Sequence, residues 1–237
     1  MLRIDRLQLL RLGAELILII VGVLLAFQVD AYREKRDNQS RTLTQLNAIR
    51  SELSENLSRL DRVIDLQEVV TTAQITVLRI ANSEEPFPDR DEMGQNIRRA
   101  TMFFRTEPIT GAYDSLVASG DLRIIDDPSL RAELATFMED LRTPFEDEES
   151  SLLFRTELFG TFSQYFDYLS IRAPNSPLDF PDPILEPNYE GLLDDQRYLN
   201  YLGILTAIES SIARHYRTLR EECIELIEKL DAAIAET

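Results

Sequence analysis

Two residues of the chain could supply nucleophilic chemistry, because the sequence contains one histidine, His215, and one cysteine, Cys223. A thiol becomes an efficient nucleophile when a base such as imidazole lies within hydrogen-bond distance. Eight residues along a helix separate the two side chains by about 12 Å. We therefore expect no catalytic pair and interpret Cys223 as a small core residue. A single cysteine also excludes an intramolecular disulfide and any CxxC motif.

Acidic residues form the second group that could do chemistry, by holding a metal ion. Asp179, Asp182, Asp194 and Asp195 flank a proline-rich stretch and could gather around Ca²⁺. Calcium needs about six to eight converging oxygens, and no spacing in this stretch dictates that geometry. Residues 146–149 are all acidic, which is typical of a first helical turn, where the helix dipole favours anions. We therefore predict no metal site and no cofactor.

Other signatures of catalysis are missing from the sequence. It contains no nucleophile elbow, P-loop, HExxH, EF-hand loop or GxGxxG, so we predict a protein that is not an enzyme. The formal net charge is −17, and the charges of the first thirty residues cancel. A domain with this charge is repelled by nucleic acids and anionic lipids. It suits cationic proteins or divalent ions, so a cationic periplasmic protein is one expected partner. The alternative is that the charge serves only solubility.

The element that must position everything else is an apolar run at residues 15–29, ELILIIVGVLLAFQV. As a helix, residues 12–29 rise about 27 Å, close to the ~30 Å hydrocarbon thickness of a bilayer. We predict a cytoplasmic N-terminus at 1–11 and a transmembrane helix at 12–29. The alternative is a cleaved signal peptide, since arginines precede the run and Val29-Asp30-Ala31 fits a cleavage site. The run is long for that role, so we favour an uncleaved anchor.

The orientation of the anchor follows weakly from charge, because three arginines precede the run and Arg33, Lys35 and Arg36 follow it. Long domains translocate largely regardless of charge, so we expect the N-terminus in the cytoplasm. The expected location is the bacterial inner membrane, with the C-terminal domain in the periplasm.

One side of the anchor combines Arg11, Glu15, Gly22 and Ala26 at helical spacing. Gly22 and Ala26 form a small-xxx-small pair, which lets two helices approach closely in lipid. Glu15 is costly at membrane depth unless it is paired, and Arg11 lies four residues before it. The pair is either an interfacial salt bridge or part of a docking face for a partner's transmembrane helix.

Beyond the anchor, the pattern predicts an all-α protein. Residues 30–81 form a helical stalk, since 31–81 lack Gly and Pro and leucines recur at 3.5-residue spacing. Residues 194–237 form a second long helix with the same spacing, which predicts antiparallel packing on the stalk. Residues 82–193 form a helical head that includes a proline-rich loop at 173–190.

Within the head, start and stop signals predict shorter helices. One covers 91–104, and the next is capped by Thr110 and ends at Gly120. Asp127-Pro128 starts another. The aromatic stretch 152–171 predicts the buried core of the head.

Two segments resemble a known family, namely residues 15–29 and the sequence AYDSLVASG at 112–120. They are similar to a bacterial family of single-pass membrane proteins catalogued as a domain of unknown function. Its members join a Glu-led apolar anchor to a long helix and carry an Ala-Tyr-Glu-Ser-Leu-x-x-Ser-Gly motif. The chain departs from the pattern at residues 30–32, where members often have Asn-Asn-Trp. The resemblance implies the topology and the helical fold, and it implies no activity.

These features predict a non-enzymatic accessory or scaffold subunit. Its transmembrane helix would dock to a larger membrane protein complex, with respiratory and photosynthetic complexes as the expected hosts. Its acidic helical domain would lie on the exoplasmic side. The alternative is an envelope sensor or signalling protein that acts through a partner, because about eleven cytoplasmic residues are too few for an output domain. A metal-dependent enzyme that uses the acidic loop is a third hypothesis.

Overall fold

The computed structural model describes residues 6–143, 145–173 and 176–236, and it describes side chains from Leu18 onward except that of Ile19. All regular elements in this part of the chain are helical, which confirms the all-α prediction. They are listed here in chain order: α1 (Arg6–Ala81), α2 (Arg90–Ala100), α3 (Gly111–Ser119), η1 (Asp121–Ile124), α4 (Pro128–Arg142), α5 (Glu146–Phe162), η2 (Tyr168–Ile171), α6 (Tyr189–Leu193) and α7 (Gln196–Glu236).

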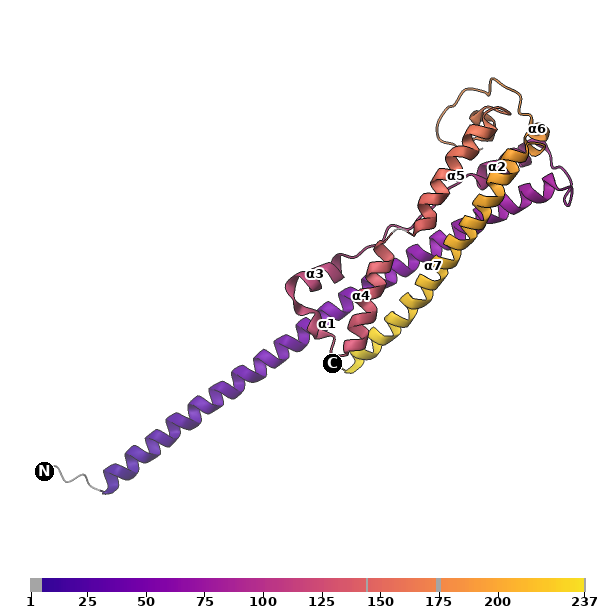
Figure 1. Cartoon of the computed structure of the whole chain (residues 1–237). Coiled ribbons are helices and arrows are strands. Elements are labelled where there is room, and N and C mark those ends of the chain that lie inside the picture. The colour runs from indigo at the N-terminus through magenta and orange to yellow at the C-terminus, as the bar shows by residue number, and fades with distance from the viewer. Residues whose placement is uncertain (1–5, 144, 174–175, 237) are drawn as a thin grey trace.

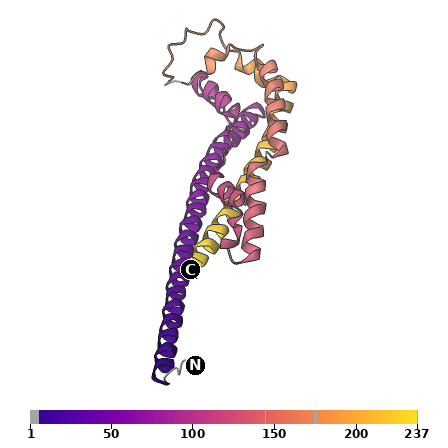
Figure 2. The same ribbon diagram turned by 90° about the vertical axis from the view of Figure 1, so that its left-hand side faces the viewer.

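Helices α1 and α7 form the long axis of the molecule (Figure 1). They run antiparallel, because Arg50 near the lower end of the pair binds Asp231, while Arg217 binds Glu68. This is the pairing that the two apolar seams predict. Helix α7 is the shorter of the two, so the N-terminal part of α1 extends beyond it alone (Figures 1 and 2).

Two hydrophobic cores lie one after the other along this axis. The lower core joins α1 around Leu53 to α3, α4 and the second half of α7 around Leu226. The upper core joins α1 around Val77 to α2, the end of α5, α6 and the start of α7. Burial of these apolar faces is the main contribution to the stability of the fold.

The segment between α2 and α3 differs from the prediction, because α2 ends at Ala100 and residues 102–110, here called the connecting segment, form no regular element. Side chains of α1 bind the end of α2 and the connecting segment. Gln74 Nε2 donates to the Ala100 carbonyl at 3.0 Å, and Gln67 Nε2 donates to the Phe104 carbonyl at 3.1 Å. Backbone groups that a longer helix would have satisfied internally are thus satisfied from a neighbouring helix.

Helix α3 begins as predicted, but its N-terminal cap comes from a distant residue. Thr110 makes no side-chain capping bond. Instead, the Glu52 carboxylate accepts hydrogen bonds from the backbone N–H groups of Ala112 at 2.6 Å and Tyr113 at 3.1 Å. Gly120 ends the helix in the left-handed conformation, with φ of 76°, as the sequence predicts.

The aromatic stretch 152–171 contributes to a buried core, as predicted, but only with part of its side chains. Phe162 and Phe166 lie in the upper core. Leu153, Phe159 and Tyr168 are exposed. The physical reason is that α5 packs mainly on α7, so one face of it contacts the bundle and the opposite face has no neighbour.

Candidate functional site

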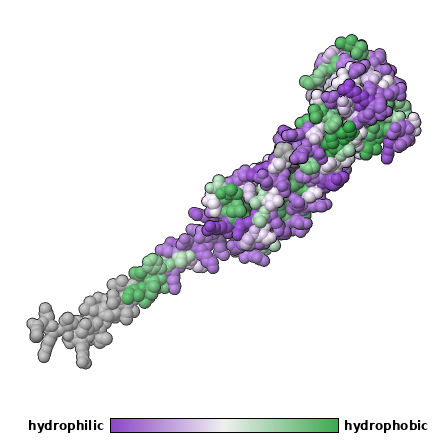
Figure 3. All heavy atoms as spheres, viewed as in Figure 1, coloured by the Kyte–Doolittle hydropathy of each residue, from purple (hydrophilic) through white to green (hydrophobic). Residues whose placement is uncertain are grey.

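The free portion of α1, by which we mean residues 20–29, is an unusual surface for a folded protein. Every residue from 20 to 41 is exposed, although residues 20–29 are largely apolar. Leu18 is 76 % exposed and Phe27 is 68 % exposed. Figure 3 shows this stretch as a band of hydrophobic side chains on the single helix. Residues 30–41 continue the same helix with a polar sequence.

Of the four predicted docking residues, the structure describes the side chains of Gly22 and Ala26. Both are exposed, and a Cβ atom added at Gly22 would meet no atom within 4 Å. Arg11 and Glu15 lie in the backbone range of α1, but their side chains, and hence the predicted pair, lie outside the described residues.

Among the described residues, no helix is both long enough and apolar enough to cross a membrane. The predicted transmembrane helix at 12–29 lies only partly within the residues whose side chains are described.

His215 and Cys223 lie apart in the structure and have separate packing roles. The His215 ring stacks on Phe145, with centroids 4.4 Å apart and an angle of 9° between the planes. Cys223 is buried, and its thiol donates to the Leu53 carbonyl at 3.3 Å. Burial, with a smaller contribution from Asp61, raises the pKa of the Cys223 thiol to about 12. The thiol is therefore protonated at neutral pH, which disfavours nucleophilic chemistry.

Two of the acidic residues considered as Ca²⁺ ligands bind different partners in the structure. Asp182 pairs with Arg172, and Asp195 accepts a hydrogen bond from the Tyr165 hydroxyl at 2.7 Å. In residues 146–149, Glu148 is buried and accepts from the Tyr216 hydroxyl at 2.6 Å. Within the part of the chain that the structure describes, no three His, Cys, Asp or Glu residues are grouped to hold a metal ion.

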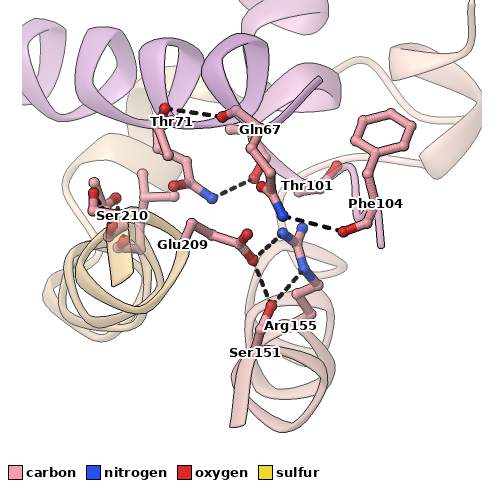
Figure 4. Close-up of polar contacts among 12 residues, drawn as sticks. Gln67, Thr71, Thr101, Phe104, Ser151, Arg155, Glu209 and Ser210 are labelled. Atoms are coloured by element: carbon pink, nitrogen blue, oxygen red, sulfur yellow. Dashed lines mark hydrogen bonds and ion pairs between the residues drawn. The ribbon is translucent and has the colours of Figure 1, made fainter. Parts of the chain in front are cut away.

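A layer of buried polar side chains separates the two hydrophobic cores, and Figure 4 shows it in close-up. Its centre is an ion pair between Arg155 of α5 and Glu209 of α7, with an N–O distance of 2.5 Å. Ser151 donates to the same Glu209 oxygen and accepts from Arg155 Nε at 3.2 Å. The Arg155 guanidinium also lies over the ring of Phe103, 5.5 Å from its centroid. The layer thus links α5, α7 and the connecting segment.

This polar layer is not fully satisfied. Arg155 Nη1, Glu209 Oε2 and Gln67 Oε1 have no hydrogen-bond partner among the described residues. Burial lowers the pKa of Arg155, and the charge and hydrogen bond of Glu209 oppose that effect. A buried ion pair with unused bonding capacity contributes little net stability, because its desolvation cost offsets most of the attraction between the charges.

The polar positions of α1 are residues that sequence reasoning missed. They are buried and bind the end of α2, the connecting segment or α3, and they are Glu52, Asn56, Gln67 and Gln74. The Asn56 side chain donates to the Ile109 carbonyl at 2.7 Å and accepts from the Ile109 N–H at 2.8 Å. The available signal was their spacing, because intervals of four, eleven and seven residues keep one helical face.

Several open grooves lie beside the stalk. One, about 1010 Å³, lies where α7 ends, between residues 31–46 of α1 and residues 120–127. Another, about 220 Å³, lies between residues 105–108 and the His215–Tyr216 turn of α7. Burial is the largest cause that raises the pKa of Tyr216, and the hydrogen bond to Glu148 adds to it. Neither groove brings together a nucleophile and a base.

Comparison with known protein families matches residues 15–157 to DUF6090, a family of unknown function. Neither the curated proteins nor the solved structures gave a match. The matched residues make up more than half of the 237-residue chain and extend from the apolar run of α1 into α5. The proline-rich loop and α7 lie beyond them. On this match, the chain belongs to the family of unknown function DUF6090.

Proposed function

We propose that this protein is a non-enzymatic accessory or scaffold subunit that docks through the N-terminal part of α1 to a larger membrane protein complex. The observation that carries the proposal is the free portion of α1. Its apolar residues are exposed, and no other element of the described chain covers them. Exposed apolar surface of this extent is unfavourable in water. Lipid and partner helices provide the apolar surroundings that it requires.

The proposed location is the bacterial inner membrane, with the N-terminus in the cytoplasm and the rest in the periplasm. The apolar sequence extends from 12 to 29, close to the length that a bilayer needs. Residues 30–41 would then hold the helical bundle about 18 Å from the bilayer surface. Residues 42–237 carry a net charge of −19, because residues 1–41 hold seven Lys and Arg and five Asp and Glu. This separation reduces repulsion from anionic lipids.

Docking is proposed to use the side of α1 that carries Gly22 and Ala26. Small residues permit close backbone approach, which is the main source of packing energy between helices in lipid. The Gly22 side is open in the free chain, since an added Cβ there would touch nothing.

Replacing Gly22 tests this proposal. Gly22→Leu should remove the protein from its host complex during purification in mild detergent, while the chain stays in the membrane fraction. Gly22→Ala keeps a small side chain, so it should retain association. Leu24→Phe adds bulk about 200° around the helix and is the matched control. Undiminished co-purification of Gly22→Leu would contradict docking through this face.

The alternative function is an envelope sensor or signalling protein that acts through a partner. One observation favours it, namely the partly unsatisfied polar layer around Arg155 and Glu209, which joins two separate cores. Such a junction is a candidate two-state element between the head and the membrane. Under this alternative, a folded Arg155→Met/Glu209→Leu variant should change co-purification with the partner at the anchor. For an accessory subunit, co-purification should stay at the wild-type level.

A further inference from the structure

The proline-rich loop at the far end of the molecule is held by its polar groups. Arg172 Nη1 donates to the Pro181 carbonyl at 2.7 Å, and the same guanidinium pairs with Asp182 at 3.5 Å. The backbone N–H of Ile184 donates to Asp167 Oδ2 at 3.4 Å. The loop ends where the N–H of Asn188 donates to the Tyr165 carbonyl at 2.8 Å. These contacts fix the described part of the loop against the head.

The apolar side chains of this loop are exposed instead of buried. Ile184 is 88 % exposed, and Leu178, Phe180 and Leu185 are also exposed. An isolated loop normally buries such residues and leaves its polar groups in water. The inverse arrangement here, with polar contacts inside and apolar groups outside, is typical of a surface that binds something.

Two exposed aromatic rings lie at the same end of the molecule, on α5 and on the short helix η2 that follows it. The rings of Phe159 and Tyr168 are both exposed and lie 6.4 Å apart, and Tyr168 directly follows Asp167, the residue that binds the Ile184 backbone. Figure 3 shows hydrophobic side chains at this end of the molecule, opposite the N-terminal end. We call this the tip surface, and it consists of Phe159, Tyr168, Leu178, Phe180, Ile184 and Leu185.

The loop that carries most of the tip surface is negatively charged, although Arg172 and Arg90, which lie outside it, pair with two of its carboxylates. Residues 173–196 contain six acidic residues and no Lys or Arg. The carboxylates of Asp182 and Glu186 are 96 % and 86 % exposed even though each pairs with an arginine. This rim would repel anionic lipids and a second copy of the same surface. It is complementary to a protein whose docking groove is bordered by Lys and Arg.

Five prolines in the same loop, at 174, 177, 181, 183 and 187, reduce the entropy that binding would cost. We propose that the tip surface is the docking site for a second protein, one that presents an apolar groove with a cationic rim. This site is separate from the proposed docking through α1, and it lies at the opposite end of the molecule. The chain would therefore connect a membrane complex to a cationic protein held at a distance from the bilayer.

The test begins with a photo-crosslinking amino acid, p-benzoylphenylalanine, at position 184 of the full chain in intact cells. Position 69 of α1, where Val69 is 44 % exposed on the stalk, is the matched control. The tip position should give an adduct with a protein that the control position does not give. The crosslinked peptide of that protein should lie in an apolar surface bordered by Lys or Arg.

The purified partner is then measured against the full chain in nanodiscs. Ile184→Ser should weaken binding by tenfold or more, as expected for a central apolar contact. Asp179→Asn should lower the salt dependence of the association rate, because a rim charge acts mainly on encounter. Val69→Ser should bind like the wild type. Ile184 and Asp179 are exposed, and neither side chain makes a described contact, so both variants should keep the wild-type melting curve.

Several results would overturn the proposal. These are equal adducts at the two positions, an adduct with a second copy of the chain, and unchanged affinity of Ile184→Ser. Binding of the nanodisc-embedded chain to vesicles of phosphatidylethanolamine and phosphatidylglycerol, lost in Ile184→Ser, would assign the tip surface to lipid and also overturn it. Loss of partner binding in Ile184→Ser with retained binding in Gly22→Leu would show that the two docking sites are independent.

Discussion

At the scale of single residues, buried polar side chains do two different things in this protein. Glu52 and Asn56 satisfy backbone groups of segments that have no helical partners of their own. Arg155 and Glu209 satisfy mainly each other, between the two cores. The first kind positions the chain, because a missing acceptor would leave buried N–H groups unpaired. The second kind has a large desolvation cost that its own attraction only partly offsets.

The Arg155–Glu209 pair should show strong coupling. Arg155→Met alone should lower the free energy of unfolding by about 3–5 kcal/mol, because it leaves a buried carboxylate without its partner. The double variant Arg155→Met/Glu209→Leu should recover most of that loss, since no buried charge remains. Urea unfolding of the full chain in mild detergent, followed by circular dichroism, measures both. A double variant as unstable as the sum of the singles would show that the pair does not act as a unit.

The capping role of Glu52 has its own test. Glu52→Ala removes the acceptor for two backbone N–H groups of α3 and should cost about 1–3 kcal/mol. Glu55→Ala, one turn away, removes a carboxylate that pairs with Arg59 on the surface and should change stability by less than about 1 kcal/mol. The measurement is the shift of the urea midpoint. Equal effects of the two substitutions would contradict the capping role.

At the scale of elements, the pairing of α1 with α7 decides the architecture. Both helices carry apolar residues at heptad-like spacing, and surface ion pairs between them are consistent with the same register. Arg50 occupies a seam position and is accommodated because Asp231 of α7 lies opposite, with N–O distances of 2.7 and 3.2 Å. Helix α5 contacts this pair through one face, which leaves its other face exposed.

Two alanine substitutions on α1 compare the stability contribution of its buried seam with that of its exposed face. Leu53 of α1 is fully buried where the helix packs on α7. Leu53→Ala should therefore lower the free energy of unfolding by about 2–5 kcal/mol through lost burial and a cavity. Val69 is exposed on the same helix, so Val69→Ala should cost less than about 1 kcal/mol. Thermal unfolding of the two variants beside the wild type gives the comparison. A Leu53→Ala variant with wild-type stability would show that the two helices separate in solution.

At the scale of the whole molecule, uncovered apolar surface lies at both ends of one rigid axis. The free portion of α1 is at the N-terminal end and the tip surface is at the other, with the two cores and the polar layer between them. A continuous helix of 76 residues connects the two ends and fixes their separation. This arrangement is the one that the proposed connecting role requires.

The proposed topology makes one prediction for the complete chain. A reporter that is active only outside the cytoplasm, fused after Thr237, should be active, because the head is expected on the exoplasmic side. A fusion of the same reporter before Met1 should be inactive and serves as the control. Enzyme activity measured in intact cells distinguishes the two. Activity of the N-terminal fusion alone would reverse the orientation.

The sequence by itself determined the helical class, the unbroken α1, the Gly120 stop and the start at Asp127-Pro128, because these depend on local preferences within a few residues. Only the tertiary structure decided the rest. The capping of α3 by Glu52 spans 60 residues, and the exposure of Phe159 depends on which face of α5 meets α7. An apolar side chain has the same sequence pattern whether it faces a core or a partner. Its role therefore became visible only when the neighbouring helices were in place.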